Sequence, residues 1–87
     1  MRAYGHVQGV FFRTETADRA STLDLAGWVR NVADGSVEAA IEGEPDAVDR
    51  LVEFMRTGPP DARVHRVDVS DEQPEQLRGF DVAPDST

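Results

Sequence analysis

The dipeptide Asp34-Gly35 constrains the fold of this chain most strongly, because it predicts a tight turn between two paired strands. Residues 27–32 (GWVRNV) precede the turn and have the composition of a strand. Residues 36–42 follow it, with apolar side chains at alternate positions: Val37, Ala39 and Ile41. That alternation predicts one buried face and one more polar face. The middle of the chain is therefore expected to be an antiparallel hairpin.

A helix is expected on the N-terminal side of this hairpin. Residues 14–25 (TETADRASTLDL) bring small and apolar side chains roughly onto one face: Ala17, Ala20, Leu23 and Leu25. Thr14 or Thr16 is the expected cap at the start of this helix, since a threonine hydroxyl can accept a hydrogen bond from a free N–H group.

A second helix is expected after the hairpin. Pro45 suits a first turn, where its missing N–H group removes no hydrogen bond. Gly58-Pro59-Pro60 should end the helix. Its apolar stripe has helical spacing: Val48, Leu51, Val52 and Met55.

The ends of the chain supply the remaining strands. Residues 1–4 are the end of a short first strand, and residues 63–69 form another whose alternation is broken, which a β-bulge would explain. A last extended piece around Phe80 and Val82 is expected at a sheet edge. The order βαββαβ predicts a single α+β domain over residues 1–87, with two helices on one face of an antiparallel sheet.

The composition excludes several classes of function. Seventeen acidic residues against nine basic ones give a net charge of -8, which argues against a general nucleic-acid binder. All the basic residues are arginines, as expected from a GC-rich genome, from adaptation to high salt, or from both. The chain has no cysteine, which excludes disulfides and thiolate zinc sites and fits a cytoplasmic protein. We expect no signal peptide and no membrane segment.

The segment Gly5 to Arg13 (GHVQGVFFR) is the first candidate functional feature. Two glycines bracket a short loop, and an arginine stands where a helix could begin. Free N–H groups at a helix start attract anions, and an arginine can add a forked, charged hydrogen bond to phosphate. The segment therefore indicates a phosphate site, although glycine turns before helices are also common.

Three segments together resemble the acylphosphatases: GHVQGVFFR, then AGWVRNVADGSVEA at residues 26–39, then GPPDARV at residues 58–64. The resemblance implies a ferredoxin-like sandwich that hydrolyses acyl phosphates, small-molecule mixed anhydrides, to a carboxylate and inorganic phosphate. It implies no metal and no cofactor. By the same resemblance Arg13 binds the phosphate and Asn31 positions the attacking water. The residues of the implied phosphate-binding loop are Gly5, His6, Val7, Gln8, Gly9, Val10, Phe11 and Phe12.

Several side chains near these motifs have two interpretations. Gln8 either braces the loop by hydrogen bonds or faces solvent. Phe12 and Trp28 are expected in the core, where large apolar residues usually lie, whereas Phe11 is either core or a wall for the acyl group. His6 would add positive charge near the phosphate only when its imidazole is protonated. His65 is expected on the surface, and two isolated histidines make no metal site.

One position departs from the family pattern, and two other functions stay open. Asp24 stands where the helix before AGWVRN usually ends in glycine. If the position is left-handed, aspartate tolerates it less well than glycine, and we expect a small cost in stability. The chain could instead be a non-catalytic ferredoxin-like binding or regulatory module. It could also be the acylphosphatase-like domain of a larger carbamoyl-transfer maturation protein, although its 87 residues favour a free-standing enzyme. We expect that enzyme to be a monomer.

Overall fold

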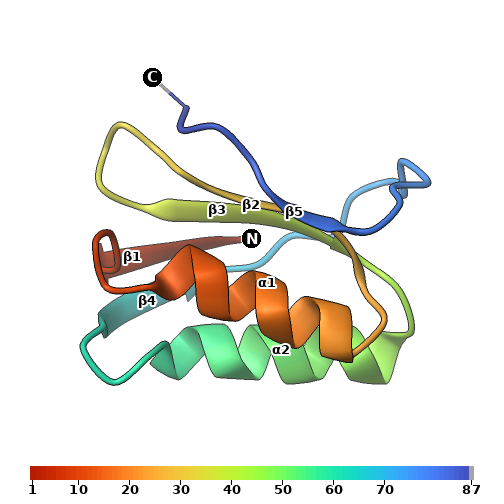
Figure 1. Cartoon of the computed structure of the whole chain (residues 1–87), viewed down its shortest axis with the longest axis horizontal. Helices are drawn as coiled ribbons and strands as arrows, with labels where there is room; N and C mark the ends of the chain where they lie inside the picture. Colours follow the sequence, from red (N-terminus) through yellow and green to blue (C-terminus); the bar gives the residue numbers. More distant parts are fainter. Residues whose placement is uncertain (87) are drawn as a thin grey trace.

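The computed structural model describes residues 1–86, in which five strands and two helices follow one another in the predicted order (Figure 1). Thr87, the last residue of the predicted domain, lies outside the described residues. The elements are β1 (Arg2–His6), α1 (Phe12–Thr22), β2 (Ala26–Asn31), β3 (Val37–Glu42), α2 (Pro45–Thr57), β4 (Arg63–Asp68) and β5 (Phe80–Val82).

The strands form one sheet in the order β4-β1-β3-β2-β5. Strands β4, β1, β3 and β2 pair antiparallel, and the short β1 lies between β4 and β3, inside the sheet. The prediction of an antiparallel sheet was wrong at one edge, because β5 pairs with β2 in parallel. Strands β4 and β5 are the two edges of the sheet. Because β5 runs in the same direction as its neighbour β2, the sheet is mixed.

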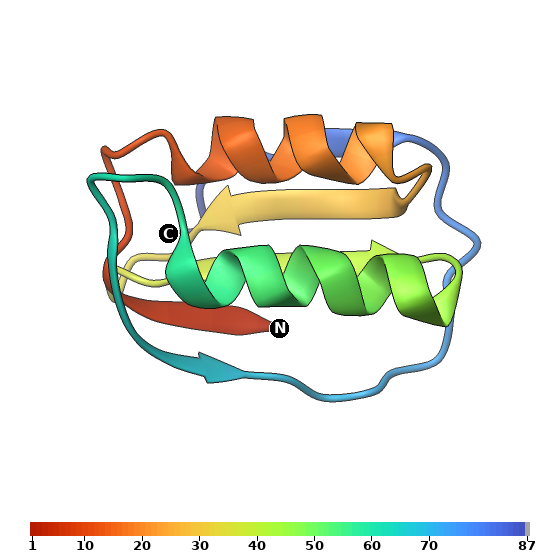
Figure 2. The same ribbon diagram turned by 90° about the horizontal axis from the view of Figure 1, so that it is seen from below.

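Both helices cover the same face of the sheet, and the core lies between the two layers (Figures 1 and 2). Its fully buried side chains include Phe12, Val29 and Val37 from α1, β2 and β3, and Leu51 and Met55 from α2. Among residues 1–86, no helix is long and apolar enough to cross a bilayer.

The prediction that Trp28 belongs to the core was wrong. Its neighbours Gly27 and Val29 are buried, whereas Trp28 is only partly buried. Successive side chains of a strand point to opposite faces, so Trp28 lies on the face away from the helices. There the guanidinium of Arg30 stacks 4.7 Å from the centre of its ring. This cation–π contact stabilises the indole ring of Trp28 outside the core.

Helix α1 begins earlier and ends earlier than the periodicity indicated. Phe11, not a threonine, is the residue before its first turn, and no side chain caps it. Thr14 and Thr16 lie inside the helix, so the capping prediction was wrong. At the other end Asp24 has a φ of 59°, and the N–H groups of Leu25 and Asp24 donate to the carbonyls of Ala20 and Ser21. This is a Schellman motif, so Asp24 does take the left-handed conformation that glycine usually has at such a helix end.

The predicted bulge lies between β1 and β4. Tyr4 pairs with Arg66 and the next residue, Gly5, pairs with Val64, so His65 is the extra residue on β4. It is exposed, as predicted. A Cβ atom on Gly5, whose φ is 133°, would lie 2.0 Å from the carbonyl oxygen of Arg63. The strand pairing therefore requires glycine at this position.

The hairpin and the second helix confirm the predictions from turn chemistry. The N–H group of Val32 donates to the carbonyl of Ser36 across the turn at 2.9 Å. Helix α2 has Pro45 at its start, and Gly58, with a φ of 73°, follows its last residue.

Candidate active site

The predicted site residues gather at one end of the molecule. The connection from β1 to α1, the β2–β3 turn and the C-terminal segment all lie at this end in both views (Figures 1 and 2). The predicted phosphate-binding loop is divided among three elements. Gly5 and His6 belong to β1, Phe12 and Arg13 to α1, and only residues 7–11 form the connection itself.

Two buried valines attach this connection to the core. Val7 and Val10 are 1% and 6% exposed, while Gly9 between them is exposed and has a φ of 74°. Within residues 1–86, the N–H groups of residues 8–11 donate no backbone hydrogen bond. The first N–H groups of α1, including those of Phe12 and Arg13, have no partner inside the helix either. The loop thus presents consecutive free donors beside the positive end of a helix dipole.

Gln8 braces the loop, which was one of its two interpretations; the other was that it faces solvent. Its Nε2 atom donates to the carbonyl of Val32 at 2.8 Å and to that of Ser36 at 3.0 Å. Both acceptors belong to the β2–β3 turn. The two hydrogen bonds therefore fix the connection formed by residues 7–11 against the turn that follows Asn31.

Arg13 and Asn31 are joined through two consecutive residues of the C-terminal segment. The Nη1 atom of Arg13 donates to Oδ1 of Asp85 at 3.1 Å, with both side chains partly exposed. The N–H group of Ser86 donates to the carbonyl of Asn31 at 2.8 Å. This segment continues alongside β2 in parallel, with a bridge between Val32 and Ser86. The tertiary structure therefore connects, through this segment, the two residues that the sequence singled out.

The side chain of Asn31 carries an unusual feature. Its Oδ1 atom is buried and has no hydrogen-bond partner among residues 1–86. Buried carbonyl oxygens nearly always have a partner, from the protein or from water. This oxygen therefore has an acceptor position that no other group among the described residues fills.

Sequence reasoning missed Asp85 and Ser86. The tail was expected to contribute only a strand near Phe80 and Val82, and nothing in a run of polar residues marks one carboxylate as a partner of Arg13. Arg13 and Asp85 are 72 positions apart in the sequence. The parallel pairing of β5 with β2 directs the tail toward this end of the sheet.

Paired charges lie on the sheet face away from the helices. Glu38 on β3 accepts hydrogen bonds from Arg30 on β2 at 2.7 and 2.9 Å and from Arg2 on β1 at 3.1 Å. Burial raises the pKa of Glu38, but these two guanidinium groups outweigh that effect and hold it below its ordinary value. Burial likewise lowers the pKa of the Met1 amino group, which donates to the carbonyl of Ala39.

The β2–β3 turn contains a second stabilised carboxylate. Oδ1 of Asp34 accepts hydrogen bonds from the hydroxyl and the N–H group of Ser36, at 2.5 and 2.9 Å. These bonds lower the pKa of Asp34. The turn on which Gln8 rests is therefore fixed by its own side chains.

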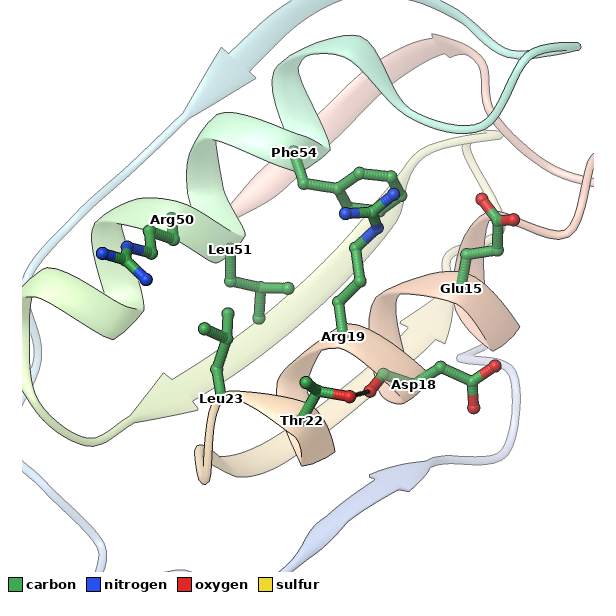
Figure 3. A pocket seen from close by; sticks show the side chains of 8 residues that line it. All are labelled: Glu15, Asp18, Arg19, Thr22, Leu23, Arg50, Leu51 and Phe54. Carbon is green, nitrogen blue, oxygen red and sulfur yellow. Dashed lines mark hydrogen bonds between the residues drawn. The ribbon is translucent and has the colours of Figure 1, made fainter.

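A hollow of about 480 Å³ lies elsewhere, between the outer sides of α1 and α2 (Figure 3). Arg19 covers the ring of Phe54 there, 4.1 Å from its centre, and the lining also includes Glu15, Asp18 and Arg50. None of the residues predicted for the phosphate site lines this hollow. Within residues 1–86, no group of three His, Cys, Asp or Glu side chains is placed to hold a metal ion.

Known proteins resemble this chain over most of its length. The family model described as Acylphosphatase matches residues 1–82. An acylphosphatase of Thermococcus kodakarensis is 52% identical over 82 residues, which cover 94% of this chain and 90% of that protein. One of Trichormus variabilis is 55% identical over 78 residues, covering 90% and 77%. The crystal structure of an acylphosphatase from Bacillus subtilis superposes with a TM-score of 0.90 at 35% identity, covering 94% and 92%.

Proposed function

Since this chain belongs to the acylphosphatase family, an enzyme family that hydrolyses acyl phosphates, we propose that Arg13 and Asn31 perform that reaction here. The binding-module and maturation-protein alternatives have less support, because the relatives matched over most of their own length are named acylphosphatases. The finer proposal concerns which atoms hold the phosphate and which hold the water.

The phosphate lies against the loop N–H groups and Arg13. An acyl phosphate has a good carboxylate leaving group, and its transition state spreads negative charge over the three equatorial phosphate oxygens. The N–H groups of residues 8–13 and the guanidinium provide positive charge where this charge develops. Because the loop is already attached through Val7, Val10 and Gln8, these donors need little rearrangement during the reaction.

Asn31 positions the attacking water in line with the leaving carboxylate. Its unpartnered, buried Oδ1 is the observation that most supports this role. An amide cannot remove a proton at neutral pH. The water therefore attacks phosphorus as the bond to the carboxylate oxygen breaks, and its proton passes to a phosphate oxygen of the substrate. No metal and no cofactor takes part in this scheme.

The test is release of inorganic phosphate from acetyl phosphate by the wild type, Arg13→Ala and Asn31→Ala, with and without a chelator. We expect each variant to lose at least about a hundredfold in kcat/KM, in line with the removal of one charge-stabilising or positioning group. Arg56→Ala and Gln73→Ala, changed outside the site, are the matched controls and should keep full activity. Circular dichroism confirms that every variant is folded. Activity retained in either site variant would refute its assignment, and loss of rate with the chelator would contradict the metal-free scheme.

We further propose that the enzyme is a cytoplasmic monomer that binds neither nucleic acid nor membranes. The net charge of -8 and the lack of cysteine support this proposal. Sedimentation at micromolar concentration tests whether the enzyme is a monomer. Retention of the enzyme on anionic vesicles or on RNA would contradict the proposed lack of membrane or nucleic-acid binding. Adaptation to high salt is the further interpretation of the acidic, lysine-free composition.

A further inference from the structure

Phe11 is the most exposed large apolar side chain among residues 1–86, with 75% of its surface accessible. Its backbone is also unusual, because its φ of 64° lies in the left-handed region. That conformation is unfavourable for a bulky side chain and free of strain for glycine. The position therefore loses stability in two ways by carrying phenylalanine.

The core does not require an aromatic side chain at Phe11, because the neighbouring Phe12 already fills it. Phe12 is 1% exposed, and its ring lies 6.4 Å from the ring of Phe54, centre to centre. The adjacent aromatic side chains thus have opposite environments. Strained residues with exposed side chains are found at functional sites more often than elsewhere.

Phe11 also has a suitable position. It is the last residue before α1, two positions before Arg13, and its own N–H group is among the free donors of the loop. A phosphate oxygen bound by that N–H group would lie about 2.9 Å from the nitrogen. The phenyl group of the same residue is then within reach of whatever is attached to the phosphate.

We propose that Phe11 is a specificity-determining residue, whose phenyl group packs against the acyl group of the substrate. The enzyme accordingly favours acyl phosphates with an aromatic or extended apolar acyl group over acetyl phosphate. This inference rests on the proposed phosphate site at residues 5–13, because it takes the phosphate as the fixed end of the substrate.

The test compares KM and kcat for benzoyl phosphate and acetyl phosphate in Phe11→Gly. We expect the ratio of KM for benzoyl phosphate to KM for acetyl phosphate to rise about three- to tenfold, as on loss of one aromatic contact. Glycine accepts the left-handed backbone, so the variant should fold at least as well as the wild type. Phe11→Asn, which also tolerates this backbone, should give the same shift, and Phe11→Tyr should restore the preference.

Val69→Gly is the matched control, because Val69 is 51% exposed and follows β4 at the opposite end of the sheet. It should leave the ratio of the two KM values unchanged. Equal shifts for both substrates in Phe11→Gly would overturn the proposal, since Phe11 would then shape the loop. An unchanged KM for both substrates would also overturn the proposal. So would a wild-type dimer that Phe11→Gly abolishes, because the exposed phenyl group would then contact a second copy of the chain. Failure of the phosphate site itself is recognised separately, by activity retained in Arg13→Ala.

Discussion

Asp85 accepts a hydrogen bond from the guanidinium of Arg13, while the next residue, Ser86, donates its N–H group to the carbonyl of Asn31. A tail segment thus contacts both residues assigned to catalysis. The carboxylate of Asp85 is itself an anion, so it occupies part of the guanidinium that we propose for the phosphate.

Asp85→Asn removes this negative charge while keeping the size of the side chain. We expect KM for acetyl phosphate and the inhibition constant of inorganic phosphate to fall about two- to fivefold, the range for an ion pair between partly exposed groups. The constants come from initial rates with inorganic phosphate as inhibitor. If kcat drops tenfold and KM stays constant, Asp85 orients Arg13 and does not compete with the substrate. Asp81→Asn, a change on β5 away from Arg13, is the control.

Gln8→Ala removes both hydrogen bonds between the proposed phosphate-binding loop and the β2–β3 turn. We expect the free energy of unfolding to fall by about 1 to 3 kcal/mol, for two hydrogen bonds, together with a lower kcat/KM. Urea titration and phosphate release measure the two effects. Gln76→Ala, in the connection before β5, should change neither, and an unchanged stability in Gln8→Ala would contradict the bracing role.

Gly5→Ala and Gly9→Ala form a matched pair of glycine substitutions in the predicted loop. At Gly5 a new Cβ would meet the Arg63 carbonyl, so we expect a loss of about 3 kcal/mol or more. At Gly9 the Cβ meets nothing within 4 Å, and only its positive φ costs about 1 to 2 kcal/mol. Thermal unfolding compares the two variants. Equal losses would contradict the close approach of β1 and β4 at Gly5.

Glu38→Gln tests the paired charges on the open sheet face through pH. The two arginines lower the pKa of Glu38 in the folded state below its unfolded value of about 4.3. The resulting stabilisation is present above the unfolded pKa and is lost as pH falls through the folded pKa. We expect the wild type to exceed Glu38→Gln by about 1 kcal/mol at pH 7, since the arginines are partly exposed, and the difference to shrink as pH falls below the unfolded pKa. A difference that is constant from pH 7 to pH 3 would exclude a charge effect.

Added salt should lower KM for acyl phosphates. A protein with a net charge of -8 repels an anionic substrate, and ions at about 0.15 M screen that field beyond about 8 Å. Initial rates between 10 and 500 mM NaCl measure the effect, with melting temperatures recorded in parallel. A monotonic fall in both activity and melting temperature would contradict adaptation to high salt.

Local chemistry explains which parts of the fold were predictable. The turn at Asp34-Gly35, the start of α2 at Pro45 and its end at Gly58 depend on the φ angles and hydrogen-bonding groups of a few adjacent residues. The bulge at His65 was visible as a break in alternation. The motifs likewise indicated Arg13 and Asn31, because the resemblance to the family depends on short, continuous segments.

Contacts between distant segments were decided only by the tertiary structure. Trp28 has the composition of a core residue, yet the strand's alternation and the single helical layer place it on the open face beside Arg30. Asp85 looks like any acidic tail residue, yet the parallel pairing of β5 with β2 brings it to Arg13. The sequence alone therefore determined the order of elements and the motifs of the site, since both depend on neighbouring residues. Which side chains meet across the sheet depends on the path of the whole chain, and that only the folded structure decided.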